Sequence, residues 1–306
     1  VFKALSLRKI SGMGHKSGFV NILGNPNVGK STLMNSLVGE KLSIITSKAQ
    51  TTRHRIMGIV SGDDFQIVYS DTPGIIQPKY KLQESMMKFV AGAFEDADVL
   101  LYVTDVFETT FKNPETFVRL QSIGIPVFVL INKIDISQPE KVEELASSWK
   151  QILPNAEIFP VSALKKTNLN NLLGRILEVL PENPPYFPKD EMTDRSARFF
   201  VSEIVREKIL LNYKEEIPYC TEVEVEEFKE DVDIIRIMAA IHVIRDSQKG
   251  IIIGHKGASI KKVGTEARKD IEAFFEKKVY LELFVKVTPD WRDKMFHLKN
   301  FGYLNQ

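Results

Sequence analysis

The chain has 306 residues, which predicts two domains rather than one. Hydrophobic residues make up 43% of the chain and charged residues 26%, as in proteins with packed cores. The formal net charge is only +1, so any basic surface that binds nucleic acid or membrane must be local. The single cysteine, Cys220, excludes an intrachain disulfide framework and fits a reducing compartment. No apolar run is long enough to span a bilayer.

The first 15 residues are expected to form a flexible N-terminal arm, because chain ends are commonly disordered. This stretch contains Lys3, Arg8 and Lys9 among scattered apolar residues. It lacks the continuous apolar segment and the small-residue cleavage site of a secretory signal. Whether the arm has a function, such as weak affinity for a surface, is left open.

Residues 16–181 alternate strand-like and helix-like segments. Short apolar runs predict five strands, at residues 19–23, 65–69, 99–103, 127–131 and 158–161. Amphipathic segments predict helices at residues 30–38, 82–94, 139–151 and 169–180. This alternation predicts an α/β domain whose mostly parallel sheet is covered by helices on both faces.

Four prolines within residues 181–188 can neither continue a helix nor join a central strand. We therefore expect a semi-rigid linker at residues 182–195. Residues 196–306 then predict a smaller α+β domain. Its expected helices lie at 196–211, 260–275 and, as a short terminal helix, 290–301, and its expected strands at 221–226, 234–244 and 279–287.

A phosphate-binding loop follows the first strand and opens the first helix. The pattern Gly-x4-Gly-Lys-Ser lets the backbone pass close to phosphate oxygens, and the helix N-terminus adds positive potential. Lys30 is expected to reach the β- and γ-phosphates, and the Ser31 hydroxyl to ligate Mg²⁺. The candidate residues are Gly24, Asn25, Pro26, Asn27, Val28, Gly29, Lys30, Ser31 and Thr32. The alternative is a chance glycine-rich turn.

Three further motifs follow strands in the order expected for a GTP site. The second strand ends in Asp71, Thr72, Pro73 and Gly74, where the Asp71 carboxylate is expected to hold a Mg²⁺-bound water and the Gly74 amide to sense the γ-phosphate. The fourth strand is followed by Asn132, Lys133, Ile134 and Asp135, and the fifth by Ser162, Ala163 and Leu164. A carboxylate at Asp135 can accept two hydrogen bonds that guanine offers and adenine does not. Together the motifs predict GTP as the ligand.

A threonine in the loop at residues 43–55 is expected to complete the Mg²⁺ shell when GTP is bound. Thr52 is preferred over Thr51, and a merely polar loop is the alternative. The expected metal ligands are therefore Ser31, Thr52 and Asp71, the last through water. The residues expected to act in catalysis are Lys30, Thr52, Gly74 and Asn27.

These motifs resemble the Era family of bacterial GTPases. The likeness rests on the phosphate loop, on residues 48–55 (Lys-Ala-Gln-Thr-Thr-Arg-His-Arg) and on Asp-Thr-Pro-Gly. It continues through residues 193–196, 203–208, 264–270 and 281–287, and covers about residues 16–303. Only the N-terminal arm falls outside it.

The glutamine that orients the attacking water in Ras-like switches is missing, because Gly74 is followed by Ile75 and Ile76. Intrinsic hydrolysis of GTP is therefore expected to be slow, with K⁺ and RNA as candidate stimulators. The resemblance implies that a phosphate-loop asparagine, here Asn27, can help coordinate K⁺, which would supply positive charge near the transferred phosphate. The alternative is that Asn27 only shapes the loop.

A Gly-x-x-Gly turn with a basic middle enters the helix at residues 260–275, which is the backbone clamp of a KH domain. The apolar side chains of residues 251–253 are expected to floor a groove for unstacked bases. From Arg245 to Lys269 there are seven basic residues against two acidic ones, whereas acidic residues dominate residues 214–233. The order of elements favours the type II KH arrangement. The expected RNA-binding residues are Ile253, Gly254, His255, Lys256, Gly257, Lys261, Lys262 and Arg268. A solvated basic helix face is the alternative.

The resemblance implies a switch protein that binds the 3′ end of small-subunit (16S) ribosomal RNA during assembly of the 30S subunit. It also implies a cytoplasmic monomer, and peripheral contact with the inner face of the cell membrane is suggested by the family alone. Two other functions are considered: an RNA-binding module with a structural, non-switching GTP site, and a phosphotransferase kinase. The intact motifs argue against both.

Overall fold

The computed structural model describes residues 14–108 and 114–304, so the predicted arm lies outside the described residues except for its last two positions. Internal contacts divide the chain into two compact units. The first unit runs up to Ser43 and adds Thr52–Gln77 and Met86–Asp194. The second unit comprises Ile44–Thr51, Pro78–Ser85 and the chain from Arg195 onward. No helix in the described part of the chain is long and apolar enough to cross a membrane.

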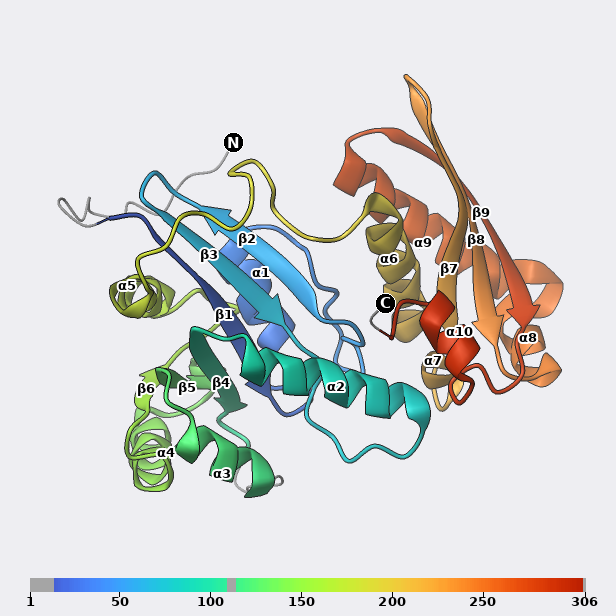
Figure 1. Ribbon diagram of the computed structural model, residues 1–306. Helices are drawn as coiled ribbons and strands as arrows, with labels where there is room; N and C mark the ends of the chain where they lie inside the picture. The colour runs from blue at the N-terminus through green and yellow to red at the C-terminus, as the bar shows by residue number, and fades with distance from the viewer. Residues whose placement is uncertain (1–13, 109–113, 305–306) are drawn as a thin grey trace. The chain divides into compact units, whose positions relative to one another are not determined.

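The first unit is built on a six-stranded sheet in the order β2-β3-β1-β4-β5-β6 (Figure 1). Strand β2 runs antiparallel to β3, and all other neighbours are parallel. The strands are β1 (Lys16–Gly24), β2 (Ile56–Ser61), β3 (Phe65–Asp71), β4 (Val99–Asp105), β5 (Val127–Asn132) and β6 (Glu157–Pro160). The predicted mostly parallel sheet is confirmed, and β2 is an edge strand that the sequence analysis did not predict.

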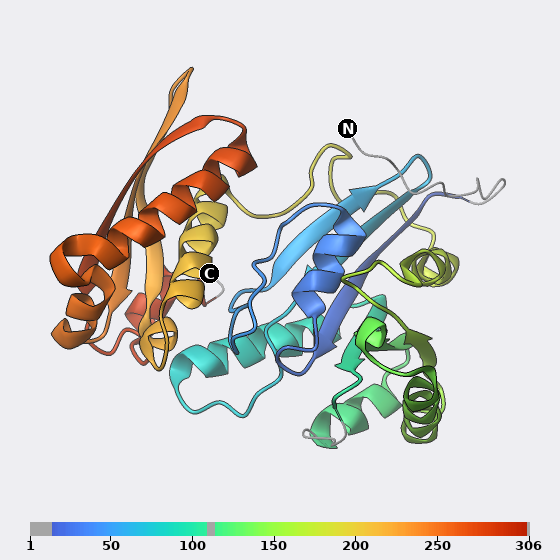
Figure 2. The same cartoon turned by 180° about the vertical axis from the view of Figure 1, so that it is seen from behind.

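Helices cover both faces of this sheet. They are α1 (Lys30–Val38), α2 (Lys81–Glu95), α3 (Pro114–Ser122), α4 (Pro139–Ile152) and α5 (Leu169–Val179), with a 3₁₀ turn, η1 (Ile134–Ile136), after β5. Apolar residues of α2, α3 and α4 share one core cluster with β4 and β5, whereas α1 lies on the opposite face (Figure 2). The carboxyl ends of the parallel strands therefore meet at one edge, where ligands of such sheets bind.

The proline-rich segment after α5 is fixed to the first unit by the buried side chain of Gln66 in β3. Its Oε1 accepts hydrogen bonds from the backbone amides of Tyr186 and Phe187, at 2.8 and 2.9 Å. Its Nε2 donates to the Phe187 carbonyl at 2.8 Å. Further on, the Ile59 amide of β2 donates to the Met192 carbonyl at 2.8 Å. The predicted semi-rigid segment thus owes its order to side-chain contacts as well as to proline.

The second unit holds a three-stranded sheet in the order β7-β8-β9, with β7 antiparallel and β9 parallel to β8. Its strands are β7 (Glu222–Glu230), β8 (Ile234–Val243) and β9 (Lys278–Val287). Its helices are α6 (Ala197–Asn212), α7 (Ile217–Cys220), α8 (Asp246–Ile253), α9 (Ala258–Phe275) and α10 (Met295–Asn300), with a 3₁₀ turn, η2 (His255–Gly257). Apolar residues of α6, α8 and α9 pack with the sheet into one core, which confirms the predicted α+β fold.

Candidate nucleotide and nucleic-acid sites

The backbone of the phosphate loop requires glycine at both ends of its pattern. Gly24 has φ 147°, and a Cβ there would lie 2.1 Å from the Val103 carbonyl oxygen. Gly29 has φ 97°, and a Cβ there would lie 2.3 Å from the Asn132 Nδ2. These positive φ angles disfavour any side chain. The close approach to β4 and to the residue that ends β5 places the loop at the carboxyl edge of the sheet.

Lys30 lies folded back within this loop. Its buried Nζ donates to the carbonyl oxygens of Gly24 at 3.1 Å and Asn25 at 2.9 Å. Burial lowers the pKa of Lys30 to about 8, while the carboxylates of Asp71 and Glu108 act in the opposite direction and raise it. The ammonium is therefore destabilised in the free protein, and a bound phosphate would supply the missing negative charge.

The three residues expected to ligate Mg²⁺ converge at one point. The Ser31 Oγ donates to the Asp71 Oδ2 at 2.7 Å and lies 2.9 Å from the Thr52 Oγ1. The Thr52 Oγ1 also donates to the Asp71 Oδ2, at 3.3 Å. The buried Asp71 Oδ1 has no hydrogen-bond partner in the described part of the chain. A set of oxygen donors with an unsatisfied carboxylate oxygen fits a hard cation such as Mg²⁺.

The hydroxyls of Thr51 and Thr52 make different contacts. The Thr51 hydroxyl donates to the Lys48 carbonyl at 2.7 Å and lies 2.6 Å from the Thr46 hydroxyl, so it is engaged within its own loop. The Thr52 hydroxyl instead faces Ser31 and Asp71. Of the two alternatives left open by the sequence, the geometry favours Thr52 as the metal ligand.

Gly74 lies against the phosphate loop, where a Cβ would come within 2.8 Å of the Pro26 ring and backbone nitrogen. The next residue, Ile75, donates its amide to the Gly24 carbonyl at 3.1 Å. The Ile75 side chain is buried in the apolar cluster with α2, α3 and α4. The position that carries a catalytic glutamine in Ras-like switches is therefore a core position here. Nearby, the Thr72 hydroxyl donates to the Ile22 carbonyl at 2.7 Å.

Asn132 connects the phosphate loop to the predicted base-binding segments. Its Nδ2 donates to the Val28 carbonyl at 2.8 Å, and its Oδ1 accepts from the Ala163 amide at 3.0 Å. Asp135 accepts a hydrogen bond from the Ser162 Oγ at 2.6 Å. The structure thus brings the Asn-Lys-Ile-Asp and Ser-Ala-Leu motifs together, with Leu164 largely exposed beside them. Thr32 lies in the first turn of α1.

Two acidic residues near the site were missed by the sequence analysis. Asp105 ends β4 and pairs with Lys133, whose Nζ lies 2.6 Å from its Oδ2 and donates to the Asn27 carbonyl at 2.7 Å. Glu108 accepts hydrogen bonds from the side chains of Asn25 and Thr104. The only available signal was that Asp105 ends its strand in the same way that Asp71 ends β3.

The Gly-x-x-Gly turn lies between α8 and α9 in the second unit. Gly254 has φ 72°, and a Cβ there would lie 2.2 Å from the Ser259 Oγ. Gly257 has φ 78°, and a Cβ there would meet nothing within 4 Å. His255 and Lys256 between them are exposed. The turn thus presents an open backbone directly before the N-terminus of α9, a suitable place for a phosphate.

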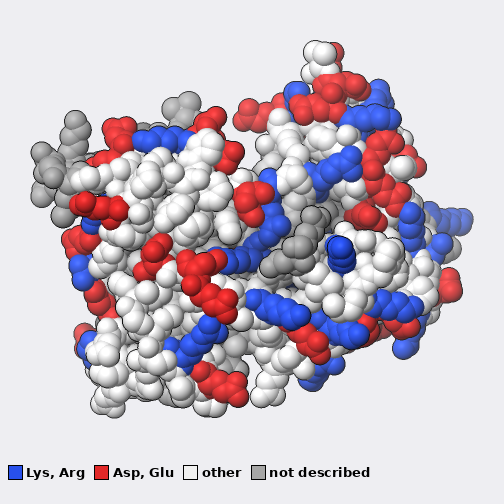
Figure 3. Space-filling model, in the orientation of Figure 1, with Lys and Arg blue, Asp and Glu red and all other residues white. Residues whose placement is uncertain are grey.

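Basic side chains follow this turn along the exposed face of α9. Lys261, Lys262 and Arg268 are exposed, with Lys262 and Arg268 in long i,i+4 ion pairs at 3.9 and 3.7 Å. Figure 3 shows Lys and Arg side chains near α8, whereas Asp and Glu dominate the tip of the β7–β8 hairpin. The charge polarity expected from the sequence is therefore present on the folded unit.

The apolar floor expected from residues 251–253 is only partly available. Helical periodicity in α8 places Ile252 fully in the core and Ile251 on the surface, 49% exposed. Ile253 is half-buried and packs against the core. The expectation that all three residues line a groove is therefore wrong for Ile252.

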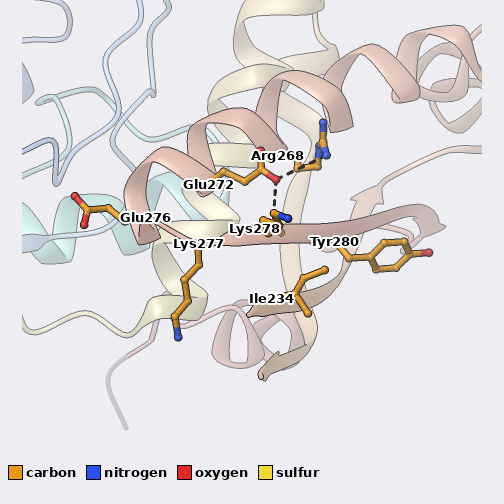
Figure 4. Close-up of a pocket in the computed structure, with 8 residues that line it drawn as sticks. Ile234, Arg268, Glu272, Glu276, Lys277, Lys278 and Tyr280 are labelled. Carbon is orange, nitrogen blue, oxygen red and sulfur yellow. Dashed lines mark hydrogen bonds and ion pairs between the residues drawn. The ribbon is translucent and has the colours of Figure 1, made fainter. Parts of the chain in front are cut away.

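An open hollow of about 740 Å³ lies between the end of α9 and the start of β9 (Figure 4). Its lining includes Arg268, Glu272, Lys278 and Tyr280. The Glu272 carboxylate lies 3.7 Å from Arg268 and accepts from the Val279 amide at 3.1 Å. Figure 4 shows Arg268 and Tyr280 pointing away from each other, so these side chains do not converge on one ligand.

Two family models match the chain: a 50S ribosome-binding GTPase over residues 19–133 and a KH domain over residues 216–292. GTPase Era from Staphylococcus epidermidis is 42% identical over 292 residues, 95% of this chain and 98% of that relative. A structure of Era in complex with MgGDPNP and nucleotides 1506–1542 of 16S ribosomal RNA is 41% identical, with TM-score 0.91, covering 95% of this chain and 100% of that one. A variant of Aquifex aeolicus Era bound to GDP and AlF4⁻ gives the same values.

A phosphate loop and a guanine-type tetrad at the edge of a six-stranded sheet, followed by a KH unit, define a P-loop GTPase with an appended RNA-binding fold. Within that class, the chain belongs to the Era family of GTPases. The resemblance inferred from the motifs is confirmed, and the chain is a GTPase. The roles assigned to single residues stay predictions.

Proposed function

We propose that this chain is a GTP-dependent switch that binds the 3′ end of 16S ribosomal RNA through its KH domain and acts in maturation of the 30S subunit. The observation that carries the proposal is the 41% identity over 95% of the chain to Era in complex with that RNA. The exposed basic residues in and after the Gly-x-x-Gly turn support it, because phosphate binding needs local rather than net positive charge. Hydrolysis then serves as a release signal, with binding energy coupled between the two ligands.

With GTP bound, Ser31 and Thr52 would hold Mg²⁺ directly and Asp71 would hold it through water, and the ion would supply positive charge to the phosphates. Lys30 turns from the Gly24 and Asn25 carbonyls toward the phosphates, and the Gly74 amide donates to the γ-phosphate. Asp135 accepts the two hydrogen bonds of guanine while Ser162 and Asn132 hold the surrounding segments in place.

Since Ile75 is part of the core, no side chain at that position orients water, and we expect the intrinsic rate of hydrolysis to be slow. We propose that K⁺ beside Asn27 supplies the missing charge. Asn27 is exposed at the loop and has a left-handed backbone conformation, with φ 66°. Turnover measured in K⁺ and in Na⁺ at matched ionic strength tests this. Equal rates in the two salts would reject a role of K⁺ in hydrolysis. Asn27 would then only shape the phosphate loop.

On the KH unit, the backbone of Gly254 and Gly257 approaches RNA phosphates, and His255, Lys256, Lys261, Lys262 and Arg268 add charge. Ile253 offers part of an apolar edge to an unstacked base. Lys256 and Lys261 are both exposed. Both ammonium groups are therefore available to phosphates.

Crosslinking and sequencing of bound RNA, performed with GTP and with GDP, tests the whole proposal. The expected result is enrichment of the 16S 3′ end that is stronger with GTP. The same enrichment with both nucleotides would favour the alternative, an RNA-binding module with a non-switching GTP site. Enrichment of unrelated RNA would reject the proposed partner.

The proposed location is the cytoplasm, where 30S subunits mature, with the chain acting as a monomer. Peripheral contact with the membrane's inner face rests on the family alone. Flotation of the protein with anionic vesicles at physiological salt measures it directly.

A further inference from the structure

The three residues that follow Thr52 are largely buried, and His54 and Arg55 contact helix α2 or the residue directly after it. Arg53 is completely buried and His54 nearly so. The His54 ring lies 6.1 Å from the ring of Phe89 in α2. The Arg55 side chain is only 11% exposed. Long basic side chains are seldom buried unless they have specific partners. This segment is therefore held in a fixed position against the domain core.

Arg55 donates hydrogen bonds to three side chains, those of Ser70, Asp96 and Asn21. Its Nε donates to the Ser70 Oγ at 2.6 Å. Its Nη1 and Nη2 donate to the two Asp96 carboxylate oxygens at 2.6 and 2.9 Å, and Nη2 also donates to the Asn21 Oδ1 at 3.2 Å. The fully buried Asn21 in turn donates to the Ala93 carbonyl and to Asp96, both at 2.7 Å. The guanidinium thus joins β1, β3 and the end of α2.

This network lies beside two groups of the metal site. Arg55 is three residues after Thr52, and Ser70 directly precedes Asp71 on β3. Arg55 therefore fixes the chain on the C-terminal side of Thr52 and is bonded to the strand that carries Asp71. The Thr52 hydroxyl lies 2.9 Å from the Ser31 hydroxyl, so the segment that Arg55 holds brings Thr52 to the phosphate-loop serine.

We propose that Arg55, held by Asp96 and Asn21, is a positioning residue that keeps Thr52 in place for metal-bound GTP. The proposal rests on the metal-ligand role of Thr52 stated above. Because Thr52 completes the metal shell only in the GTP state, the network strengthens binding of Mg²⁺–GTP and leaves GDP almost unaffected. The mechanism is entropic, since a segment that is already fixed loses less conformational freedom when the ligand binds.

The half-exposed Asp96 would make this ion pair a weak source of stability if it stood alone. The Arg55–Asp96 pair contributes through its geometry, because a bidentate guanidinium–carboxylate pair has one fixed orientation. A lysine cannot reproduce that orientation. Arg55→Lys should therefore keep the charge but recover only part of the effect.

The test compares the affinities of Arg55→Ala, Arg55→Lys and Asp96→Asn for a non-hydrolysable GTP analogue with Mg²⁺ and for GDP. Arg55→Ala is expected to raise the Kd for the analogue about tenfold, the loss of roughly one charged hydrogen bond, and the Kd for GDP less than about twofold. Asp96→Asn and Arg55→Lys should fall between wild type and Arg55→Ala. Arg119→Ala is the control and should change neither Kd, because it removes a long, exposed ion pair with Glu95, the residue before Asp96, and a stacking contact with Phe94.

Equal weakening of GDP and analogue binding by Arg55→Ala, or an Arg119→Ala effect of the same size, would overturn the proposal. If Arg55→Ala does not fold, Asp96→Asn decides, because an unchanged ratio of the two Kd values there also rejects it. Thr52→Ala separates this inference from its basis. If Thr52→Ala leaves analogue affinity unchanged, the metal role of Thr52 fails, and if only Thr52→Ala weakens it, the role of Arg55 fails alone.

Discussion

The hydroxyl of Ser162 donates a hydrogen bond to the Asp135 Oδ1 at 2.6 Å. Ser162 therefore orients the carboxylate on which guanine selectivity is expected to depend, although 27 residues separate the two in sequence. The Ser162 hydroxyl also accepts from the Lys165 amide at 3.0 Å, so its own direction is fixed. A backbone turn, a hydroxyl and a carboxylate form one chain of hydrogen bonds at the base-binding end of the site.

Replacing Asp135 with Asn should exchange guanine for xanthine selectivity. The amide cannot accept both guanine hydrogen bonds, so we expect the Kd for GDP to rise by about 100-fold or more and that for xanthosine diphosphate to fall. Titration with both nucleotides measures the change. Ser162→Ala removes only the group that orients the carboxylate, so it should raise the Kd for GDP by less than about tenfold. Unchanged preference in Asp135→Asn would contradict the assigned role.

Binding of GDP should be coupled to a proton at Lys30. In the free protein its pKa of about 8 means that Lys30 loses its proton as pH rises through 8. Phosphates favour the charged form and raise the pKa again, so binding takes up a proton near that pH and affinity falls as pH rises further. Calorimetry in buffers of different ionisation enthalpy measures the uptake. A binding enthalpy that does not depend on the buffer at about pH 8 would refute the coupling.

Charge reversal at the Gly-x-x-Gly turn should abolish RNA binding. Lys256→Glu combined with Lys261→Glu places two negative charges beside the open backbone, and we expect RNA affinity to fall at least about 100-fold at low salt. GTP binding should be unchanged. Lys229→Glu, an exposed lysine of the acidic hairpin, is the control and should retain RNA binding. Survival of RNA affinity in the double variant would show that the groove is elsewhere.

Gln66 should stabilise the first unit, because its side chain holds the proline-rich segment at Tyr186 and Phe187. Gln66→Leu removes all the hydrogen bonds of a buried amide and leaves two backbone amides without their acceptor, at a cost of about 2–4 kcal/mol. Urea unfolding measures the loss, and limited proteolysis after residue 185 should accelerate. Gln121→Leu, which removes one exposed hydrogen bond, is the control and should cost under about 1 kcal/mol.

Sequence patterns were sufficient where one segment carried its own signal. The helix at Lys30–Val38 was predicted with its observed bounds, because the glycine-rich loop marks its start and Gly39 its end. Strand β2 was missed because Gly58 interrupts its apolar run. The structure explains that glycine: a Cβ at Gly58 would lie 2.7 Å from Val38 and 2.9 Å from Met34, so packing on α1 requires what strand propensity opposes.

Contacts between residues that are far apart in the chain leave no comparable signal in the sequence. Arg55 and Asp96 are 41 residues apart, and nothing in the short motif around either one specifies the other. The sequence places Lys133 in the guanine-type tetrad, but its ion pair with Asp105 depends on β4 and β5 being neighbours. The missed part of the site is thus the part created by tertiary packing.

The segment after the proline-rich stretch also has a protective effect. Besides the Ile59–Met192 hydrogen bond, the Thr193 hydroxyl donates to the Met57 carbonyl at 2.7 Å, and the Met57 amide donates to the Asp194 Oδ1 at 3.1 Å. These contacts occupy the outer edge of β2, the border strand of the sheet. An uncovered border strand can pair with a second molecule and nucleate aggregation. The segment that connects the two units therefore also blocks the free edge of β2, so that this strand cannot pair with a strand of another molecule.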